Sequence, residues 1–569
     1  MKFSTGILLG MALIKVAGAQ AYADGNVIQA QLNAALSSGM PFFVLPNTTI
    51  TLKSSLTIPS TARDFTLIGG DNTKLIRSSA ADFPLLLIGN QNTFAFSNTP
   101  FAAFQKFNIQ PASEGASTLQ LSSATTCPPG TYAIVGAHPT NDIVRHSNGI
   151  TTFQFKRELI KVTGQSGTTL TLAEPIGRAF DTPELYLIEA DSAPSSQWQI
   201  ATRIRVINVA MDGRLGDITD GRAAISKLNR VSKAFVVGLA QDINIDNVRV
   251  KGFSNSGINV MMSKRVTIQN ATISEGNTKD LGYGIEFAAT RFTSTYNSTM
   301  QDMQVGIIFQ SGAMDGYVSN CAIPPGRGSF DVSHGCGEKR ITYENCTADK
   351  FKFGNSSYRR GGKDLRIINC SAFKDLVINS NAEDVLIRGY HPSEPITAQR
   401  ILIFTNQDGF GIPTGPIGPI SLRTEQAIIS NYELPGKTLE FINDVATTPS
   451  KLGSGTFVNT VFQNKLLSGN GVIEVGGITN PCSLTFQSCG FNNYNPSIPP
   501  VKFWGVGSGG AWNASFTSCT FTGQAPHALR TETGANGTYH FTGNTYNGSP
   551  VTATNTSNGG APGSTFVFH

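Results

Sequence analysis

Charge is scarce along this chain. Only 14% of its 569 residues are charged, the net charge is +5, and no run of basic residues is longer than two. A nucleic-acid-binding arm needs a concentrated block of basic residues, so we expect no nucleic-acid partner. A mildly basic chain remains compatible with an acidic polymer as ligand.

Long apolar runs are absent too, apart from one at the start. Residues 1–19 combine a basic beginning, an apolar stretch over residues 7–14 and small residues at Ala17 and Ala19. This pattern is typical of a cleaved secretory signal peptide, and it is too short to span a bilayer. Ten Asn-x-Ser/Thr sequons fit a secreted glycoprotein. We therefore expect an extracellular protein without a membrane partner.

Metal-binding spacing is missing as well. The eight cysteines match no zinc pattern, and carboxylates do not cluster in a way that favours calcium. We expect no cofactor, with calcium as the alternative. Glycine, by contrast, is abundant, with 59 residues, which together with low charge is typical of a turn-rich all-β protein.

The central part of the chain repeats itself. Five segments each place alternating apolar residues on both sides of an Asn. They are NIDNVRVKGF (244–253), TIQNATISEG (267–276), GYVSNCAIPP (316–325), TYENCTADKF (342–351) and RIINCSAFKD (366–375). Asn320, Asn345 and Asn369 recur at steps of 25 and 24 residues. Such a period is the signature of a repeat architecture.

One repeat reads as a strand, a tight turn in which Asn takes a left-handed conformation, and a second strand. A single coil of this kind cannot bury its inner face, whereas stacked coils about 4.8 Å apart can. The sequence therefore predicts a right-handed parallel β-helix. Cys321, Cys346 and Cys370 follow the repeated Asn and should form an inward ladder, either bridged in part or as free thiols.

The rest of the chain divides around this solenoid. DGNVIQAQLNAALSSG (24–39) has helical spacing, with Val27, Ile28, Leu32 and Leu36 on one stripe, and should cap the open end. The expected divisions are a signal peptide (1–19), a cap with first coils (20–99), an inserted β-hairpin subdomain (100–192), the central helix (193–408), a Gly/Pro-rich interruption (409–454) and C-terminal coils (455–569). The predicted fold class is all-β.

A candidate site lies in RGSFDVSHGCGEKRITYENCTADKFKFGNSSYRRGG (327–362). His334 lies eleven residues before Asn345, and Tyr358 lies eleven before Asn369, so we expect the two to stack as neighbours. Arg359 and Arg360 follow directly, and strand alternation should place one of them on the same outer face. The remaining candidates are Asp331, which can reach the same edge, and Glu286 and Asp315 upstream, which could bind substrate.

These residue types suit elimination across a uronic-acid linkage. An arginine fork neutralises the uronate carboxylate, His334 takes the proton alpha to it, and Tyr358 protonates the leaving oxygen. Asp331 would fix the imidazole tautomer. Paired carboxylates acting by inverting hydrolysis are the alternative, with Asp315, Asp331, Glu286 and Glu338 as candidates. A lectin-like protein without catalysis is a third possibility.

The chain also resembles a known superfamily. DGNVIQAQLNAALSSGMPFFVLPNTTITLKSSLTI followed by FTLIGGDNTKLI is similar to the first coils of pectate-lyase-like β-helix proteins, which include pectinases, phage tailspikes and polysaccharide lyases. The runs YGIEF, SFDVSHG and YRRGG are similar to β-helix proteins with an aspartate–histidine element followed one coil later by Arg-Gly. This resemblance implies the fold of a carbohydrate-active protein. Together with the signal segment and the residue chemistry above, we expect a secreted, monomeric polysaccharide-degrading enzyme, a lyase before a glycoside hydrolase, acting on an acidic polysaccharide.

Overall fold

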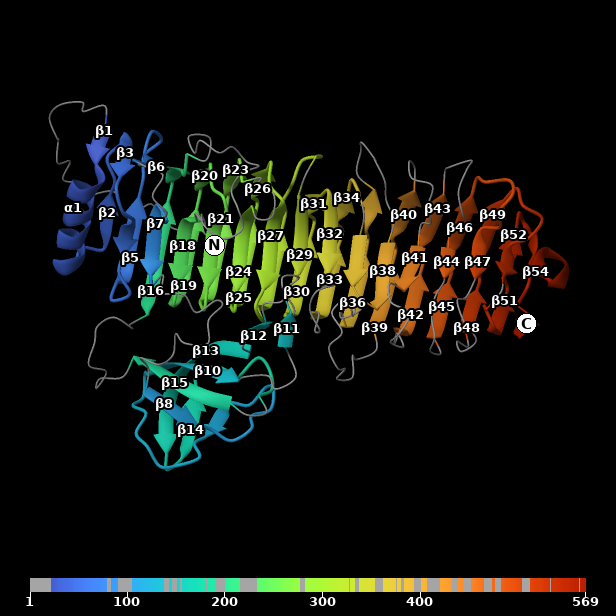
Figure 1. Ribbon diagram of the computed structural model, residues 1–569, viewed down its shortest axis with the longest axis horizontal. Coiled ribbons are helices and arrows are strands. Elements are labelled where there is room, and N and C mark those ends of the chain that lie inside the picture. The colour runs from blue at the N-terminus through green and yellow to red at the C-terminus, as the bar shows by residue number, and fades with distance from the viewer. Residues whose placement is uncertain are drawn as a thin grey trace, which may run out of the picture.

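The protein is an elongated solenoid with a smaller β subdomain on one side, as a computed structural model shows (Figure 1). The structure describes residues 22–78, 83–90, 105–137, 143–145, 151–153, 156–180, 183–189, 200–214, 233–276, 282–326, 328–332, 337–353, 362–374, 376–379, 383–392, 401–406, 420–431, 439–443, 452–464, 473–475, 482–503, 512–532, 534–561 and 563–569. No helix within these ranges is long and apolar enough to cross a bilayer.

Three long sheets form the walls of the solenoid, and each full coil adds one strand to each sheet in turn. Sheet I contains β4 (Leu56–Ile58), β7 (Leu86–Gly89), β18 (Lys233–Gly238), β21 (Ser256–Met261), β24 (Tyr283–Ala288), β27 (Val305–Gln310), β29 (Ser329–Val332), β32 (Lys350–Phe353), β35 (Leu376–Asn379), β38 (Ile401–Asn406), β41 (Leu439–Asn443), β44 (Ile473–Val475), β47 (Val501–Phe503), β50 (Leu529–Thr531) and β54 (Thr556–Asn558).

Sheet II is the longest wall. It contains β2 (Phe42–Val44), β5 (Arg63–Ile68), β16 (Ala201–Ile207), β19 (Ala240–Asp246), β22 (Lys264–Gln269), β25 (Arg291–Tyr296), β28 (Met314–Ser319), β30 (Lys339–Glu344), β33 (Lys363–Ile368), β36 (Glu383–Arg388), β39 (Ile420–Glu425), β42 (Leu452–Val458), β45 (Cys482–Gln487), β48 (Trp512–Thr517), β51 (Gly537–Thr542) and β55 (Ser564–Phe568).

Sheet III is divided into three parts. The first holds β1 (Tyr22–Asp24), β3 (Thr49–Leu52), β6 (Lys74–Arg77), β17 (Ala210–Asp212), β20 (Arg249–Lys251), β23 (Thr272–Ser274) and β26 (Thr299–Gln301). The second holds β31 (Thr347–Ala348), β34 (Ser371–Ala372) and β37 (His391–Pro392). The third holds β40 (Ile428–Asn431), β43 (Val461–Asn464), β46 (Gly490–Asn493), β49 (Thr520–Gly523), β52 (Thr545–Tyr546) and β53 (Ser549–Pro550), with a 3₁₀ turn at Ala553–Asn555.

Nearly all strand pairs within these walls are parallel, as in the pairs of β24 with β27 and of β28 with β30. The predicted fold class, an all-β right-handed parallel β-helix with an inserted β subdomain, is confirmed. One expectation is corrected. β39, β40 and β41 fall within the stretch 409–454 that was expected to interrupt the coils, and β39 pairs with β36, so the solenoid continues through part of it.

A single hydrophobic core runs along the solenoid from Ile28 to Ala561. In its C-terminal half it contains stacked rings. Phe457, Phe486 and Phe516 follow one another at centroid distances of 4.8 and 4.8 Å, with interplanar angles of 11° and 7°. Equivalent positions in successive coils carry the same residue type, so neighbouring rings meet face to face with an offset.

The repeated Asn residues make the turn from sheet II to sheet III. Asn320, Asn345 and Asn369 have φ of 54°, 52° and 51°, the left-handed region that Asn tolerates better than most residues. Each donates its backbone N–H to the next coil, as from Asn320 to the Glu344 carbonyl at 3.1 Å. The left-handed Asn turn predicted from the repeat is therefore present.

A second left-handed ladder, not expected from the sequence, stands near the beginning of the sheet II strands. Asp242, Arg265, Asp315 and Arg340 have φ of 59°, 52°, 54° and 54°. Arg265 Nε lies 2.6 Å from Asp242 Oδ1, and Arg340 Nε lies 2.5 Å from Asp315 Oδ1. Opposite charges on neighbouring coils thus stabilise backbone positions that cost about 1–2 kcal/mol each for residues other than glycine.

The predicted cysteine ladder faces the core. Cys321, Cys346 and Cys370 are buried and carry free thiols, which is one of the two expected alternatives. The Cys346 N–H donates to Cys370 Sγ at 3.4 Å. Burial raises the pKa of the Cys370 thiol well above its ordinary value, so this sulfur is a poor nucleophile.

Helix α1 (Gly25–Ser37) lies against the first coil. Asp24 caps it by accepting a hydrogen bond from the Asn26 N–H at 2.8 Å. Ile28 and Leu32 face the core, but Val27 is 54% exposed, so its place on the predicted apolar stripe is wrong. Gly25 packs directly on Leu52, where a Cβ would lie 2.5 Å from Leu52 Cδ2.

The subdomain is antiparallel and has its own core. Its main sheet runs β8 (Gln105–Asn108), β15 (Pro183–Glu189), β10 (Tyr132–Ala137), β13 (Lys156–Ser166), β14 (Thr169–Leu172) and β9 (Thr118–Gln120), and a hairpin joins β11 (Ile143–Arg145) to β12 (Thr151–Phe153). Figure 1 shows it beside the N-terminal half of the solenoid.

Removing one ring from the stack should destabilise the whole solenoid. Phe486→Ala leaves a cavity between Phe457 and Phe516, and we expect the free energy of unfolding to fall by about 3–5 kcal/mol. Denaturant unfolding followed by fluorescence measures this. Thr485→Ala, an exposed neighbour on the same strand, is the control and should change little. Equal effects of the two variants would contradict a continuous core.

Candidate functional site

The outer face of sheet I carries a row of polar side chains between apolar ones. Inward neighbours such as Ile285, Ile307 and Phe330 are fully buried in the core, so the alternate residues point outward. Strand register aligns these outward residues across successive coils. We call them the central row: Val236, Asn259, Glu286, Ile308, Asp331 and Lys352.

Two carboxyl groups lie in this row with one residue between them. Glu286 is in register with Ile308, and Ile308 with Asp331. Two strand spacings separate the carboxyl-bearing positions by about 9.6 Å. Glu286 is 3% exposed and Asp331 is 5% exposed, although both belong to the outward-facing row.

The two carboxyl groups have different surroundings. Both oxygens of Glu286 accept hydrogen bonds, one from the Ser256 hydroxyl and one from the Gln310 side-chain amide. Asp331 Oδ1 has no hydrogen-bond partner in the structure described. A buried carboxyl with an unsatisfied oxygen destabilises a fold, so its presence favours a functional role.

Burial also changes the protonation of Asp331. It raises the pKa of this carboxyl above the ordinary 3.8, and the nearby charge of Lys352 and a hydrogen bond with Ser329 oppose the shift only in part. Two carboxyl groups in unequal environments can divide the roles of acid and base. Tyr343 holds the strand in place by donating its hydroxyl to the Asp331 carbonyl at 3.0 Å.

Lysines lie at both ends of the row. Lys233 Nζ donates to Asn259 Oδ1 at 3.1 Å, and the Asn259 amide nitrogen has no partner in the structure described. At the other end Lys352 is half-buried and Lys350 is exposed. The row thus opens toward solvent on the side of β32.

The sequence-predicted residues divide into three groups. Asp331 and Glu286 share the central row. Counting along the sequence does not predict that these two residues lie on one face. Asp315 lies on β28 in sheet II, apart from them, and its carboxylate binds Arg291 and Arg340. These two guanidinium groups hold the pKa of Asp315 below its ordinary value despite burial, and its expected role in substrate binding stays a prediction.

The other four predicted residues, His334, Tyr358, Arg359 and Arg360, lie outside the described residues, and their stacking stays a prediction. Glu338, the remaining hydrolase candidate, is fully buried just before β30 and accepts the Gly312 N–H at 3.1 Å, away from the central row.

The number of residues between a position and the Asn of its coil does not identify strand neighbours in sheet I. Asp331 pairs with Lys352, 21 residues later. The Asn residues of the same coils, Asn345 and Asn369, are 24 residues apart. The link between sheet I and the Asn turn therefore varies by three residues, so distance from the Asn does not give the neighbour of a residue near β29. Aligning the alternating strands YGIEF, VGIIF and SFDV would have paired Glu286 with Asp331.

The subdomain supports the site from outside. Glu158, which is fully buried, binds Arg291, and Arg291 Nε lies 2.8 Å from Asp315 Oδ2. Arg178 of the subdomain donates to the Gly312 carbonyl, two residues after Gln310. Since Gln310 binds Glu286, this contact fixes the end of the strand that supplies a partner of the carboxylate.

Metal ligands are not gathered in the part of the chain that is described. No group of three or more His, Cys, Asp or Glu side chains there could hold a metal ion, so the calcium alternative has no ligand set among these residues.

No family model and no curated protein matches this chain. Solved structures with similar architecture include tailspikes from bacteriophages. The tailspike protein gp49 of Pseudomonas phage LKA1 is 14% identical over 95% of this chain and 77% of its own, with a TM-score of 0.49. The gp61 tailspike of Pseudomonas phage phi297 is also 14% identical, over 93% and 81%, with a TM-score of 0.49. At these identities the likeness concerns the fold alone.

A third similar structure contains a saccharide. It is the Gp54 tailspike of Acinetobacter baumannii bacteriophage AP22 in complex with A. baumannii capsular saccharide, 10% identical over 96% of this chain and 76% of its own, with a TM-score of 0.42.

Breaking the buried ion pairs should loosen the subdomain. Arg291→Met leaves Glu158 buried without its cation, and we expect a loss of about 3–5 kcal/mol in the free energy of unfolding. Thermal unfolding and limited proteolysis between residues 105 and 189 measure it. Arg203→Met is the matched control, because its partner Asp64 is exposed, and it should leave stability nearly unchanged. Wild-type protease resistance in Arg291→Met would contradict the docking role.

Proposed function

We propose that the protein hydrolyses glycosidic bonds of a polysaccharide with inversion, using Asp331 as general acid and Glu286 as general base. One observation carries the proposal: a buried Asp331 carboxyl, one of whose oxygens has no partner among the described residues, lies two strands from a second buried carboxylate on the same outward row. The wider proposal is a secreted enzyme that acts as a monomer.

The spacing favours inversion over retention. Inverting enzymes keep their carboxyl groups about 6.5–9.5 Å apart to admit a water molecule, whereas retaining enzymes need about 5–5.5 Å. Positions two strands apart are separated by about 9.6 Å at the backbone, which is at the upper limit of the first range and far from the second. A carboxyl group one strand away would have fitted the second.

The two environments assign the roles. Burial raises the pKa of Asp331, so its carboxyl is the one suited to hold a proton and deliver it to the leaving oxygen. The Glu286 oxygens each accept one hydrogen bond, and a carboxylate oxygen has a second acceptor site for the attacking water. Lys350 and Lys352 next to Asp331 favour an acidic sugar unit at that end.

Elimination by a lyase is the alternative, and product analysis must distinguish it from hydrolysis. It depends on His334, Tyr358, Arg359 and Arg360. Hydrolysis produces reducing ends without the ultraviolet absorbance of an unsaturated uronate, whereas elimination produces both. A panel of uronans and neutral glucans distinguishes the two, and binding with neither product supports the lectin-like function.

Amide variants of the pair should remove turnover. We expect Asp331→Asn and Glu286→Gln each to lower kcat about 10²–10⁴-fold, the usual contribution of a positioned acid or base. Reducing-end release over time measures this, and proton NMR of the first product reports its anomeric configuration. Glu344→Gln on the outer face of sheet II is the control and should keep full activity. Loss of activity in His334→Ala, with both amide variants active, would replace hydrolysis by elimination.

Asp331→Asn should be more stable than the wild type, although its activity should be lower. With its pKa raised in the folded state, Asp331 binds its proton more tightly there, so it costs no stability below pH 3.8 and progressively more as pH rises through the folded-state pKa. Asp331→Asn removes this cost. We expect its Tm to exceed that of the wild type above about pH 4, with a gap that widens toward neutral pH. A lower Tm at neutral pH would identify Asp331 as a structural group.

A further inference from the structure

The outer face of sheet II contains a groove of about 490 Å³ across β36, β39 and β42. Its lining includes Asp384, Leu386, Arg388, Arg423, Glu425 and Thr456. This volume lies within the range of roughly 300–1,000 Å³ for small-ligand sites. We infer that the groove is a second saccharide-binding site that takes uncharged sugar units.

The floor of the groove is apolar where its surroundings are polar. Strand register places Leu386 between Arg366 on one side and Arg423 on the other, and Thr342 and Thr456 follow in the same outward row. Leu386 is half-buried, so part of its side chain remains open to a ligand. The C–H face of a pyranose ring is apolar and suits such a floor.

The rim offers fixed donors and acceptors. Glu425 binds both arginines of the groove, with Arg388 Nε at 2.8 Å from Oε2 and Arg423 Nε at 2.5 Å from Oε1. Both contacts use Nε, and a guanidinium has five N–H donors, so further donors remain for a ligand. Because one carboxylate holds both side chains, less rotamer freedom is lost on binding.

Charge decides the class of ligand. Among the described lining residues, Arg388 and Arg423 are positive and Asp384 and Glu425 are negative. Balanced charge among these described side chains gives a polyanion no net attraction, whereas sugar hydroxyl groups both donate to carboxylates and accept from guanidinium groups. The ligand is therefore a run of neutral sugar units.

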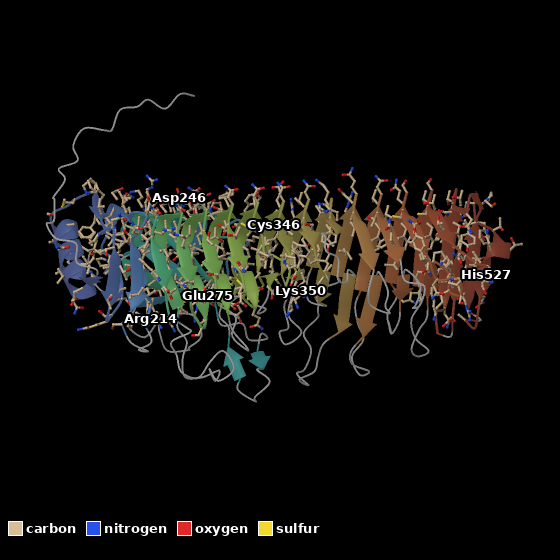
Figure 2. The ribbon with its side chains drawn as sticks, turned by 90° about the horizontal axis from the view of Figure 1, so that it is seen from above. Arg214, Asp246, Glu275, Cys346, Lys350 and His527 are labelled. Atoms are coloured by element: carbon tan, nitrogen blue, oxygen red, sulfur yellow. The ribbon has the colours of Figure 1, made fainter. Side chains whose placement is uncertain are left out.

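The groove is separate from the candidate active site. Arg388 and Glu425 continue the outward row that contains Asp246 in earlier coils, whereas the central row leads to Lys352 beside Lys350. Figure 2 shows Asp246 and Lys350 toward opposite sides of the solenoid, with Cys346 in the body between them. A bound chain on sheet II would thus leave sheet I free, which suits an enzyme that holds a polymer while cutting it. The inference depends on the proposed function only in the statement that the groove holds a polymer while sheet I cuts it.

Affinity electrophoresis tests the inference with native gels that contain soluble β-glucan, mannan, galactan or xylan, and with alginate as the acidic comparison. The Asp331→Asn background prevents consumption of the polymer. We expect at least one neutral glycan to retard the protein, and Arg423→Ala or Leu386→Asn to weaken this binding at least about tenfold. Arg366→Ala is the matched control, one strand outside the groove in the same row, and it should bind normally.

Three outcomes would overturn the inference. They are no retardation by any neutral glycan, an equal loss in Arg366→Ala, and retardation by alginate alone that disappears as salt is raised. Its failure is distinguishable from failure of the proposed function. Arg423→Ala in the otherwise wild-type chain should cleave a short oligosaccharide at the normal rate, whereas a wrong catalytic assignment leaves Asp331→Asn active whatever the groove binds.

Discussion

Every part of this protein depends on the parallel hydrogen bonding of one coil to the next. A single coil exposes its inner face, and only stacking at the strand spacing buries it. In-register stacking then fixes which side chains become neighbours. The Phe457, Phe486 and Phe516 stack, the Asn turns and the Asp–Arg ladder are all consequences of that register. The spacing of the two carboxyl groups in the central row follows from the same constraint.

In this solenoid, inward-pointing side chains provide stability, whereas outward-pointing side chains are available for binding and catalysis. Residues that point inward form a continuous apolar core, and their substitution affects neighbouring coils. Residues that point outward are free to vary with function. Asp331 and Asn259 differ, because each points outward yet is buried with a polar atom that has no partner in the described part of the chain. Such groups cost stability, and a fold with so long a core can retain them.

The repeats and their register in the Asn turns could be predicted from the sequence, because Asn tolerates the left-handed conformation and recurs once per coil. The inward cysteine ladder followed from the same pattern. Val27 is exposed, whereas Ile28 and Leu32 on the same helix face the core, because helical spacing alone does not fix which edge of an apolar stripe is covered. The ion pairs of Asp315 with Arg291 and Arg340 could not be predicted, because these partners come from strands 24 and 25 residues away in the chain.

The amino-acid sequence by itself determined that the chain coils, since alternation and a once-per-coil Asn are local properties. Only the tertiary structure decided which carboxyl groups lie on the same row and how far apart they are. The reason is physical: the segments linking sheet I to the Asn turns differ in length between coils, so lateral neighbours are set by hydrogen bonds between strands and not by counting along the chain. The same bonds place Glu286 and Asp331 two strands apart in sheet I and Asp315 in sheet II.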